Sequence, residues 1–255
     1  MKVEIKNFSY EYWPEFVDLI NDFWSKDHPI VNRSLFDWQY QGFGHNTNFE
    51  LFKILLIDGK MEGFRGVIPG LYHVPNSNLI HEGGTFSMWL VTPAYRKMGM
   101  GYKLMAEIEK ECSILMSVGS TLKTSGRIYA ANNFTYLDKF HRWTIGFDKR
   151  YINLLRDNIK KISDTKVITH NNCELDPDPV LFEKIWKKYA KDKNFFSLYR
   201  SKDFWKWRYV DSPGFKYFYF KNKFDDLIVG RIESGITSNN SQKDSLKLFR
   251  FIEII

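Results

Sequence analysis

Cysteine is almost absent from this sequence. The 255 residues contain two, Cys112 and Cys173, which lie far apart and outside any Cys-x-x-Cys spacing. This scarcity argues against a disulfide framework and against a zinc site built on cysteine pairs. We therefore expect reduced thiols, no bound metal and a cytoplasmic location.

Long apolar runs are also missing. No stretch approaches the roughly 18 apolar residues that a membrane helix requires, and the first residues lead directly into strand-like alternation instead of an apolar signal segment. The net charge is +7, but the basic residues are scattered and form no run as long as a nucleic-acid-binding arm. The sequence thus predicts neither a membrane partner nor a nucleic-acid partner, and its basic surface favours anionic substrates.

Hydrophobic residues, by contrast, make up 44% of the chain, which is enough for one large or two small packed domains. In the first part of the chain, a period of two predicts strands and a period of 3.6 predicts helices. Asp58-Gly59 is typical of a two-residue hairpin, and Pro69-Gly70 predicts a break in the chain. The expected strands are 3–10, 49–57, 61–67 and 71–74, and the expected helices are 14–24 and 32–41.

The segment from Thr85 to Cys112 is predicted to form a strand, a glycine turn and a helix. Apolar residues alternate through Phe86 and Leu90 until Pro93 ends the strand, and helical spacing of apolar residues resumes at Leu104.

The glycine turn is a candidate anion site. The first turn of a helix carries amides without helical acceptors and a partial positive charge. Gly99 and Gly101 allow a sharp turn and a close approach of phosphate to the backbone, and Arg96 and Lys97 add charge. The continuation Gly101-Tyr-Lys-Leu104 fits neither a P-loop nor a dinucleotide fingerprint.

The pattern Arg96-x-x-Gly99-x-Gly101, after a strand that closes in Val91-Thr-Pro93, resembles the acyl-CoA motif of the GNAT superfamily of N-acetyltransferases. Downstream, residues 125–134 resemble the family's tyrosine-bearing helix, with Tyr129 on its tyrosine. Asn133 replaces a glycine there, and Ser125 or a neighbour stands where asparagine is common.

This resemblance implies an α/β (α+β) GNAT fold, with a central mixed but mostly antiparallel sheet flanked by helices. It also implies acetyl-CoA as acyl-donor substrate, with pyrophosphate on the turn and pantetheine along the central strand. The Val91 amide is the implied donor to the thioester oxygen. The implied cofactor-binding residues are Leu90, Val91, Arg96, Lys97, Met98, Gly99, Met100, Gly101, Tyr102 and Ser125.

Two residues are catalytic candidates. Tyr129 is implied as general acid, since a phenol with a pKa of about 10 is protonated at neutral pH and can donate to a thiolate; the alternative is a packing tyrosine. Glu82, at the start of the central strand, is a candidate base, as are His81 and Glu62 nearby. The alternatives for the base are a surface ion pair for the glutamates and deprotonation through a water chain.

The sequence then repeats its pattern. Trp38 and Trp207 are 169 residues apart, and Gly63 and Gly230 are 167 apart, each within a similar run of residues. This offset predicts a catalytic domain over 1–148, a linker over 149–175 and a partial second GNAT-like unit over 176–255 without an acetyl-CoA motif. The repeated aromatic residues indicate packing of helices on the sheet more than sugar stacking. This set is Trp38, Tyr40, Trp205, Trp207 and Tyr209.

The predicted activity is acetyl transfer from acetyl-CoA to the primary amine of a small molecule. The tandem arrangement resembles bacterial surface-polysaccharide acetyltransferases, which implies an amino sugar, free or nucleotide-linked, as acceptor. The alternative is a non-catalytic acyl-CoA-binding or scaffold module. An unpaired C-terminal strand over 248–255 is compatible with a homodimer.

Overall fold

The computed structural model describes residues 1–41, 43, 49–77, 79–121, 123, 125–136, 173–190, 194–236 and 245–255. Two compact units divide the chain. The first joins Met1–Ile128 to Pro177–Lys216, and the second joins Tyr129–Asp176 to Tyr217–Ile255. Most of the expected linker lies outside the described residues, so the domain boundaries remain predictions. None of the helices in the described part has the length and apolar character needed to cross a membrane.

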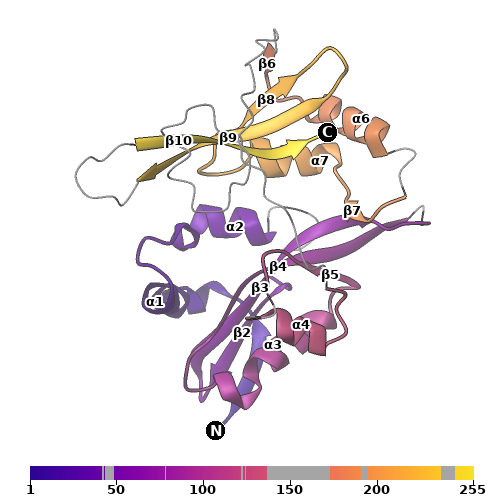
Figure 1. The fold of residues 1–255 in the computed structure, drawn as a ribbon. Helices are drawn as coiled ribbons and strands as arrows, with labels where there is room; N and C mark the ends of the chain where they lie inside the picture. Colours follow the sequence, from indigo (N-terminus) through magenta and orange to yellow (C-terminus); the bar gives the residue numbers. More distant parts are fainter. Residues whose placement is uncertain are drawn as a thin grey trace. The chain divides into compact units, whose positions relative to one another are not determined.

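The first unit is built on a mixed sheet in the order β1-β2-β3-β4-β5 (Figure 1). The first four strands pair antiparallel, and β5 runs parallel to β4. A short strand, β7, pairs with the outer end of β3. The bounds are β1 Val3–Asn7, β2 Phe52–Ile57, β3 Lys60–His73, β4 Ile80–Val91, β5 Ile114–Ser117 and β7 Ser197–Leu198.

Helices cover both faces of this sheet. In Figure 1, α1 and α2 lie on one side and α3 on the other. The core under α1 and α2 is largely aromatic and includes Phe16, Phe36 and Phe52, whereas Met100 and Leu104 of α3 pack on Leu55 and Val91. The helices are η1 Tyr10–Tyr12, α1 Trp13–Phe23, η2 Pro29–Val31, α2 Arg33–Gln41, η3 Arg96–Met98, α3 Met100–Glu109, α4 Gly126–Ala131, α6 Pro179–Ala190, α7 Lys202–Trp205 and the π-helical turn η4 Lys206–Val210.

The hairpin prediction is confirmed, and the predicted break is wrong. Asp58 and Gly59 both have positive φ, at 50° and 88°, as a tight hairpin turn requires. Strand β3, however, continues through Pro69-Gly70. Pro69 pairs with Gly84 of β4. On the other side of β3, the pairing with β2 ends at Gly66 and the pairing with β7 begins at Tyr72. The missing N–H of Pro69 therefore costs no ladder hydrogen bond.

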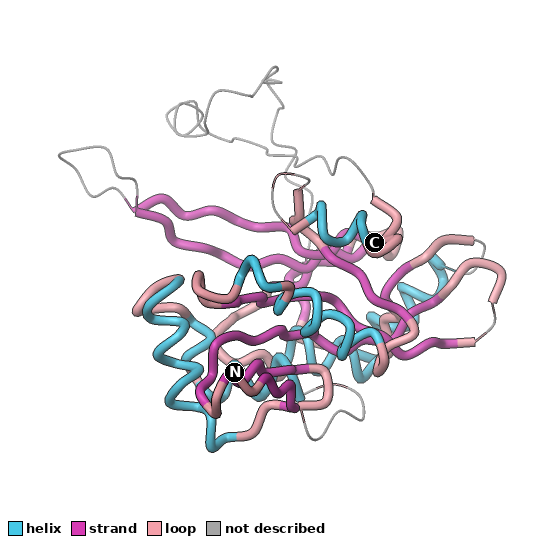
Figure 2. The backbone as a smooth tube through the Cα atoms, turned by 90° about the horizontal axis from the view of Figure 1, so that it is seen from below, coloured by secondary structure: helices cyan, strands magenta, loops and turns pink. Residues whose placement is uncertain are grey.

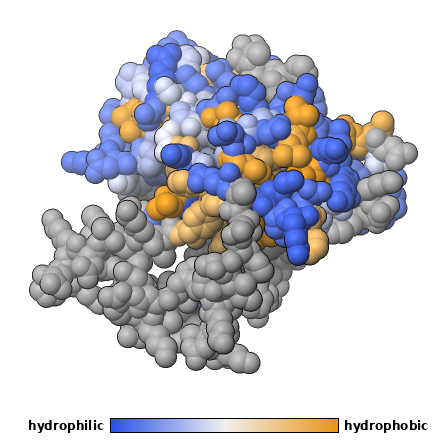
Figure 3. All heavy atoms as spheres, turned by 90° about the horizontal axis from the view of Figure 1, so that it is seen from above, coloured by the Kyte–Doolittle hydropathy of each residue, from blue (hydrophilic) through white to orange (hydrophobic). Residues whose placement is uncertain are grey.

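The second unit contains an antiparallel sheet in the order β10-β9-β8-β6, in which β9 and β10 form a long pair (Figure 2). One face of this sheet is buried and carries residues such as Tyr219 and Val229. The other face exposes apolar side chains. In Figure 3 apolar side chains gather among hydrophilic ones on the face seen from above. The bounds are β6 Cys173–Leu175, β8 Phe218–Lys221, β9 Leu227–Ile236 and β10 Ser245–Ile254.

The pairing of strands around one glycine is alike in the two sheets. Gly63 of β3 faces Leu55 of β2 and Val91 of β4. Gly230 of β9 faces Phe218 of β8 and Phe251 of β10. Along the chain, β1 is followed by the α-helices α1 and α2 and then by β2, β3 and β4. In a similar order, β6 is followed by α6 and α7, with β7 between these two helices, and then by β8, β9 and β10.

Trp38 and Trp207 contact each other inside the first unit. The Trp38 indole N–H donates to the Trp207 carbonyl and the Trp207 indole N–H donates to the Trp38 carbonyl, both at 2.8 Å. Their rings stack with centroids 5.1 Å apart. Every member of the repeated aromatic set is at most 9% exposed, so the packing interpretation is confirmed.

Candidate active site

Strands β4 and β5 separate halfway along β4. Gly83 to Phe86 pair with Ile114 to Ser117, and among the described residues the pairing of β4 with β5 ends at Phe86. On its other side β4 pairs with β3 as far as Gly63, and the Thr92 N–H donates to the Glu62 carbonyl at 2.9 Å. Because successive amides in a strand point in opposite directions, the Val91 N–H points away from β3, toward the opening.

A β-bulge interrupts β4 at this point. Arg65 faces Trp89 while Val67 faces Phe86, so two steps along β3 correspond to three along β4. Plain alternation over Phe86 to Leu90 was therefore the wrong prediction. The bulge places Phe86 and Trp89 on the same face, which a regular strand would not do.

Ser87 anchors the bulge from the face that carries α1 and α2. Its hydroxyl donates to the Gly66 carbonyl at 3.0 Å and lies 2.9 Å from the Tyr40 hydroxyl. Tyr40 is fully buried, and burial raises its pKa to about 12, so its phenol stays neutral at physiological pH. The bulge is thus held by a neutral hydrogen-bond network that sequence patterning could not reveal.

The N-terminus of α3 follows directly after β4. Gly99 has φ of 72° and ψ of 11°, a left-handed conformation that glycine adopts readily, and no side chain caps the helix. The first amide of α3 that donates to a carbonyl one turn earlier is that of Lys103, which lies 3.1 Å from the Gly99 carbonyl oxygen. The amides of Met100, Gly101 and Tyr102 therefore have no acceptor within the helix.

Packing also requires a glycine at position 101, in addition to the close approach of phosphate that the sequence predicts. A Cβ at this position would lie 2.9 Å from the Trp89 ring, so the indole fills the space a side chain would need. The sequence motif indicated the glycine but not this reason, because Trp89 precedes it by twelve residues on a different element.

The structure brings the predicted cofactor-binding residues from Leu90 to Tyr102 into one continuous segment, running from the end of β4 to the first turn of α3. Leu90 and Val91 are buried, whereas Lys97 and Met98 are exposed. The Arg96 Nε donates to the Val91 carbonyl at 2.8 Å and thereby ties the basic turn to the strand end.

Ser125 lies apart from that segment, in a chain of hydroxyls beyond β5. Its Oγ donates to the Ser120 Oγ at 3.1 Å, and Ser120 lies 2.8 Å from the Oγ of Ser117. Ser117 is the last β5 residue to pair with β4, so this chain begins where the two strands part.

Tyr129 is a buried residue of α4, 5% exposed, and its ring lies 5.4 Å from that of Phe134. Asn133 has φ of 60°, so it adopts the left-handed conformation for which the related motif uses glycine. Tyr129 belongs to the second compact unit and the predicted phosphate turn to the first. Its role as general acid remains a prediction.

Glu82 is exposed on β4 and pairs with Leu71 of β3. It precedes Val91 by nine residues, which corresponds to roughly 30 Å along an extended strand. A carboxylate there can reach a proton near Val91 only through intervening water. The side chain of Glu62 lies closer to the strand end, where it accepts a hydrogen bond from the Thr92 hydroxyl at 2.6 Å.

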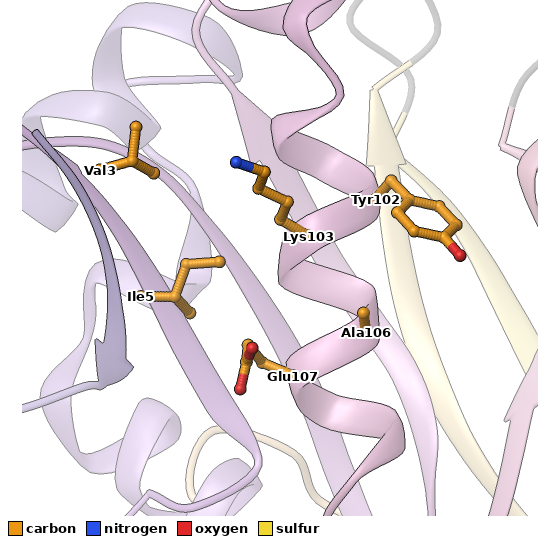
Figure 4. A pocket seen from close by; sticks show the side chains of 6 residues that line it. All are labelled: Val3, Ile5, Tyr102, Lys103, Ala106 and Glu107. Atoms are coloured by element: carbon orange, nitrogen blue, oxygen red, sulfur yellow. The ribbon is translucent and has the colours of Figure 1, made fainter. Parts of the chain in front are cut away.

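A shallow groove of about 470 Å³ runs between β1 and α3. Figure 4 shows Lys103 and Glu107 reaching toward Val3 and Ile5, while the Tyr102 ring points to the other side of the helix. The groove lies beside β1, at the opposite edge of the sheet from the opening between β4 and β5. Across the described residues, no group of three or more His, Cys, Asp or Glu side chains is arranged to hold a metal ion.

The fold is similar to that of N-myristoyltransferase from Saccharomyces cerevisiae. A crystal structure with bound myristoyl-CoA aligns at 13% identity and a TM-score of 0.55, over 98% of this chain and 64% of that one. Another, with bound myristoyl-CoA and inhibitors, aligns at 13% identity and a TM-score of 0.57, over 99% and 63%. This chain therefore spans less than two thirds of the length of those proteins.

An aminoglycoside 6'-N-acetyltransferase from Acinetobacter baumannii aligns over 58% of this chain and 100% of its own, at 14% identity and a TM-score of 0.43, and supports no conclusion. No family model and no curated protein matches the sequence. The fold is nevertheless settled by strand order and by the two yeast structures. This chain has the GNAT fold.

Proposed function

We propose that this protein is an acetyl-CoA-dependent N-acetyltransferase. The observation that carries the proposal is the divergence of β4 from β5: in the described part of the chain their pairing ends at Phe86, and β4 then leads into the N-terminus of α3, which has no side-chain cap. A pantetheine arm has amides that can pair with the edge of a strand, and a pyrophosphate fits helix-terminal amides beside Arg96 and Lys97. The yeast N-myristoyltransferase structures, which hold myristoyl-CoA, have the same fold and support the proposal.

In the proposed reaction, the acceptor amine attacks the thioester carbonyl carbon, and the Val91 amide donates to the oxyanion that develops. The C–N bond forms, the C–S bond breaks, and Tyr129 protonates the departing thiolate. The amine proton leaves through water, with Glu82 as the proposed final acceptor. The products are the acetylated amine and CoA.

The acceptor we propose to test first is an amino sugar, free or linked to a nucleotide. This choice rests on the resemblance of the sequence to sugar acetyltransferases and on the repeated pattern that we interpret as a second, partial GNAT-like unit. A nucleotide-linked sugar also suits the +7 net charge of the chain.

Donor binding is measured by titrating acetyl-CoA and CoA into the wild-type protein and two charge-reversal variants. Lys97→Glu changes the phosphate turn, and Lys110→Glu makes the same change of charge at the other end of α3. We expect about one site per chain, at least tenfold weaker binding for Lys97→Glu and less than a threefold change for Lys110→Glu. Absence of binding to the wild-type protein contradicts the proposed function, and equal losses in both variants contradict the proposed phosphate site.

Tyr129→Phe separates catalysis from binding, because it removes only the phenol oxygen. We expect turnover of acetyl-CoA with an accepted amine to fall by about 10², while acetyl-CoA affinity stays within about threefold because the ring is retained. Unchanged turnover would leave Tyr129 as a packing residue and direct attention to the serine chain at the end of β5.

A further inference from the structure

Strand β3 of the first unit carries a buried cation. Arg65 lies on β3 and is 2% exposed. Its guanidinium carbon lies 4.0 Å from the centroid of the Phe86 ring and 4.5 Å from that of Trp89. Both rings belong to β4, one on each side of the bulge, so Arg65 interacts with the two ends of the irregular segment at once.

This arrangement depends on the bulge. In a regular strand, residues three apart point to opposite faces, and no single side chain could contact both rings. The bulge turns both rings toward Arg65, and the two cation–π contacts oppose a return to regular pairing. Ser87, bonded to Gly66 and adjacent to Tyr40, holds the same segment from the opposite face.

The contact continues to α3. The Trp89 ring occupies the space that a Cβ at Gly101 would need, at 2.9 Å, and therefore supports the first turn of the helix. Arg65, Trp89 and Gly101 thus form a stack that joins the bulge of β4 to the proposed phosphate turn.

We propose that Arg65 is a positioning residue for the acyl donor. It fixes the bulge, and through Trp89 it sets the spacing between the two proposed contact points of acetyl-CoA, the Val91 amide and the α3 amides. This inference rests on the proposed function. Arg65 itself touches neither end of the donor in the proposal; it acts through Trp89 by pre-organising the site.

The test compares three variants for acetyl-CoA binding by calorimetry and for thermal unfolding. Arg65→Met keeps an apolar side chain of similar length against the rings, Arg65→Lys keeps the charge without the planar group, and Lys53→Met is the matched control. Lys53 is a second buried cation. It lies on β2, directly opposite Arg65 of β3. Its ammonium group donates to the side chains of Asn7 and Glu111.

We expect Arg65→Met to bind acetyl-CoA about tenfold more weakly with an unfolding temperature within about 5 °C of wild type. Arg65→Lys should lie between Arg65→Met and wild type, and Lys53→Met should stay within about threefold of wild type, because it removes a buried charge but not the stack. Binding of Arg65→Met within threefold of wild type overturns the inference. So does an equal loss in Lys53→Met, which would reduce the effect to charge alone.

A spectroscopic measurement distinguishes positioning from general destabilisation. In protein labelled with 5-fluorotryptophan, the Trp89 resonance is assigned by its loss in Trp89→Phe. We expect acetyl-CoA to shift this resonance in wild type, and Arg65→Met to broaden or split it before any ligand is added, while Lys53→Met leaves it unchanged. An unaltered Trp89 resonance in Arg65→Met overturns the inference while leaving the proposed function intact. A wild-type protein that does not bind acetyl-CoA overturns both.

Discussion

Two sheets of this protein pair their strands alike around a glycine and yet present different surfaces. In the first, the face that includes Val91 and Gly63 is covered by α3. In the second, the corresponding face around Gly230 leaves Phe249 and Phe251 36% and 44% exposed. The common pairing therefore does not by itself produce the surface on which we propose the donor site.

The difference lies in the residues at corresponding positions. Arg65 and Trp89 pair in the first sheet where Ile232 and Phe249 pair in the second. The first pair contains a buried cation and an indole that contacts a helix, and the second contains two apolar side chains that do not form such a stack. The two sheets thus share a pairing of strands, and the residues at these positions distinguish the candidate site from the second sheet.

We expect the largest difference between the two sheets when the aromatic residue at the corresponding position of each, Trp89 or Phe249, is replaced by alanine. Trp89→Ala removes the support of Gly101 and a contact of Arg65, and we expect it to cost about 3 kcal/mol of unfolding free energy and to abolish measurable acetyl-CoA binding. Phe249→Ala should cost about 1 kcal/mol because its ring is partly exposed, with binding unchanged. Denaturant unfolding and calorimetry measure both. Equal effects on binding would contradict the assignment of the site to the first sheet alone.

Alanine substitutions at Gly63 and Gly230, the glycines around which the two sheets pair alike, should have a smaller effect on stability. A Cβ at Gly63 would lie 2.6 Å from the backbone oxygen of Leu90. A Cβ at Gly230 would lie 2.3 Å from the Phe249 ring and 2.9 Å from the backbone oxygen of Arg250, so its approach to backbone is less close. An exposed ring can move more readily than a paired backbone. We therefore expect Gly63→Ala to cost about 2–3 kcal/mol and Gly230→Ala about 1 kcal/mol. The reverse order in chemical denaturation would show that the second sheet is the more tightly packed of the two.

The smallest effect is expected on the exposed face of the second sheet. Ile232 is 52% exposed, so Ile232→Lys should change the unfolding free energy by no more than about 0.5 kcal/mol. The oligomeric state, followed by size-exclusion chromatography with light scattering, is measured on the same samples. A loss of several kcal/mol, or a change of mass on substitution, would show that this face is covered in solution.

Much of the frame was predictable from local sequence. Asp58-Gly59 specifies a hairpin by its tolerance of positive φ, and the apolar stripes of α1, α2 and α3 follow helical spacing. The glycine turn was predictable as well, because Gly99 and Gly101 lie between a strand ending at a proline and an amphipathic helix, whereas its binding of phosphate stays a prediction. These features are determined by residues close together in the chain.

The unpredicted features depend on contacts between distant residues. The bulge of β4 is held by Tyr40 and Arg65, which come from α2 and β3, and the local alternation of Phe86 to Leu90 contains no sign of it. Likewise, Pro69 could remain within β3 only because neither β2 nor β7 pairs beside it. Local patterns indicate which segments form strands, but the partners on either side decide where a strand bends and where a proline is tolerated.

The reciprocal pairing of Trp38 and Trp207 has a consequence for the order of folding. Its partners are separated by 169 residues, and closing a flexible loop of that length costs about 4–5 kcal/mol of chain entropy. On a ribosome that synthesises the chain from its N-terminus, α2 must wait for most of the chain before Trp38 can be covered. Until then, the Trp38 indole lacks the ring and the carbonyl that it contacts in the folded first unit, so we expect this non-local contact to form late in folding.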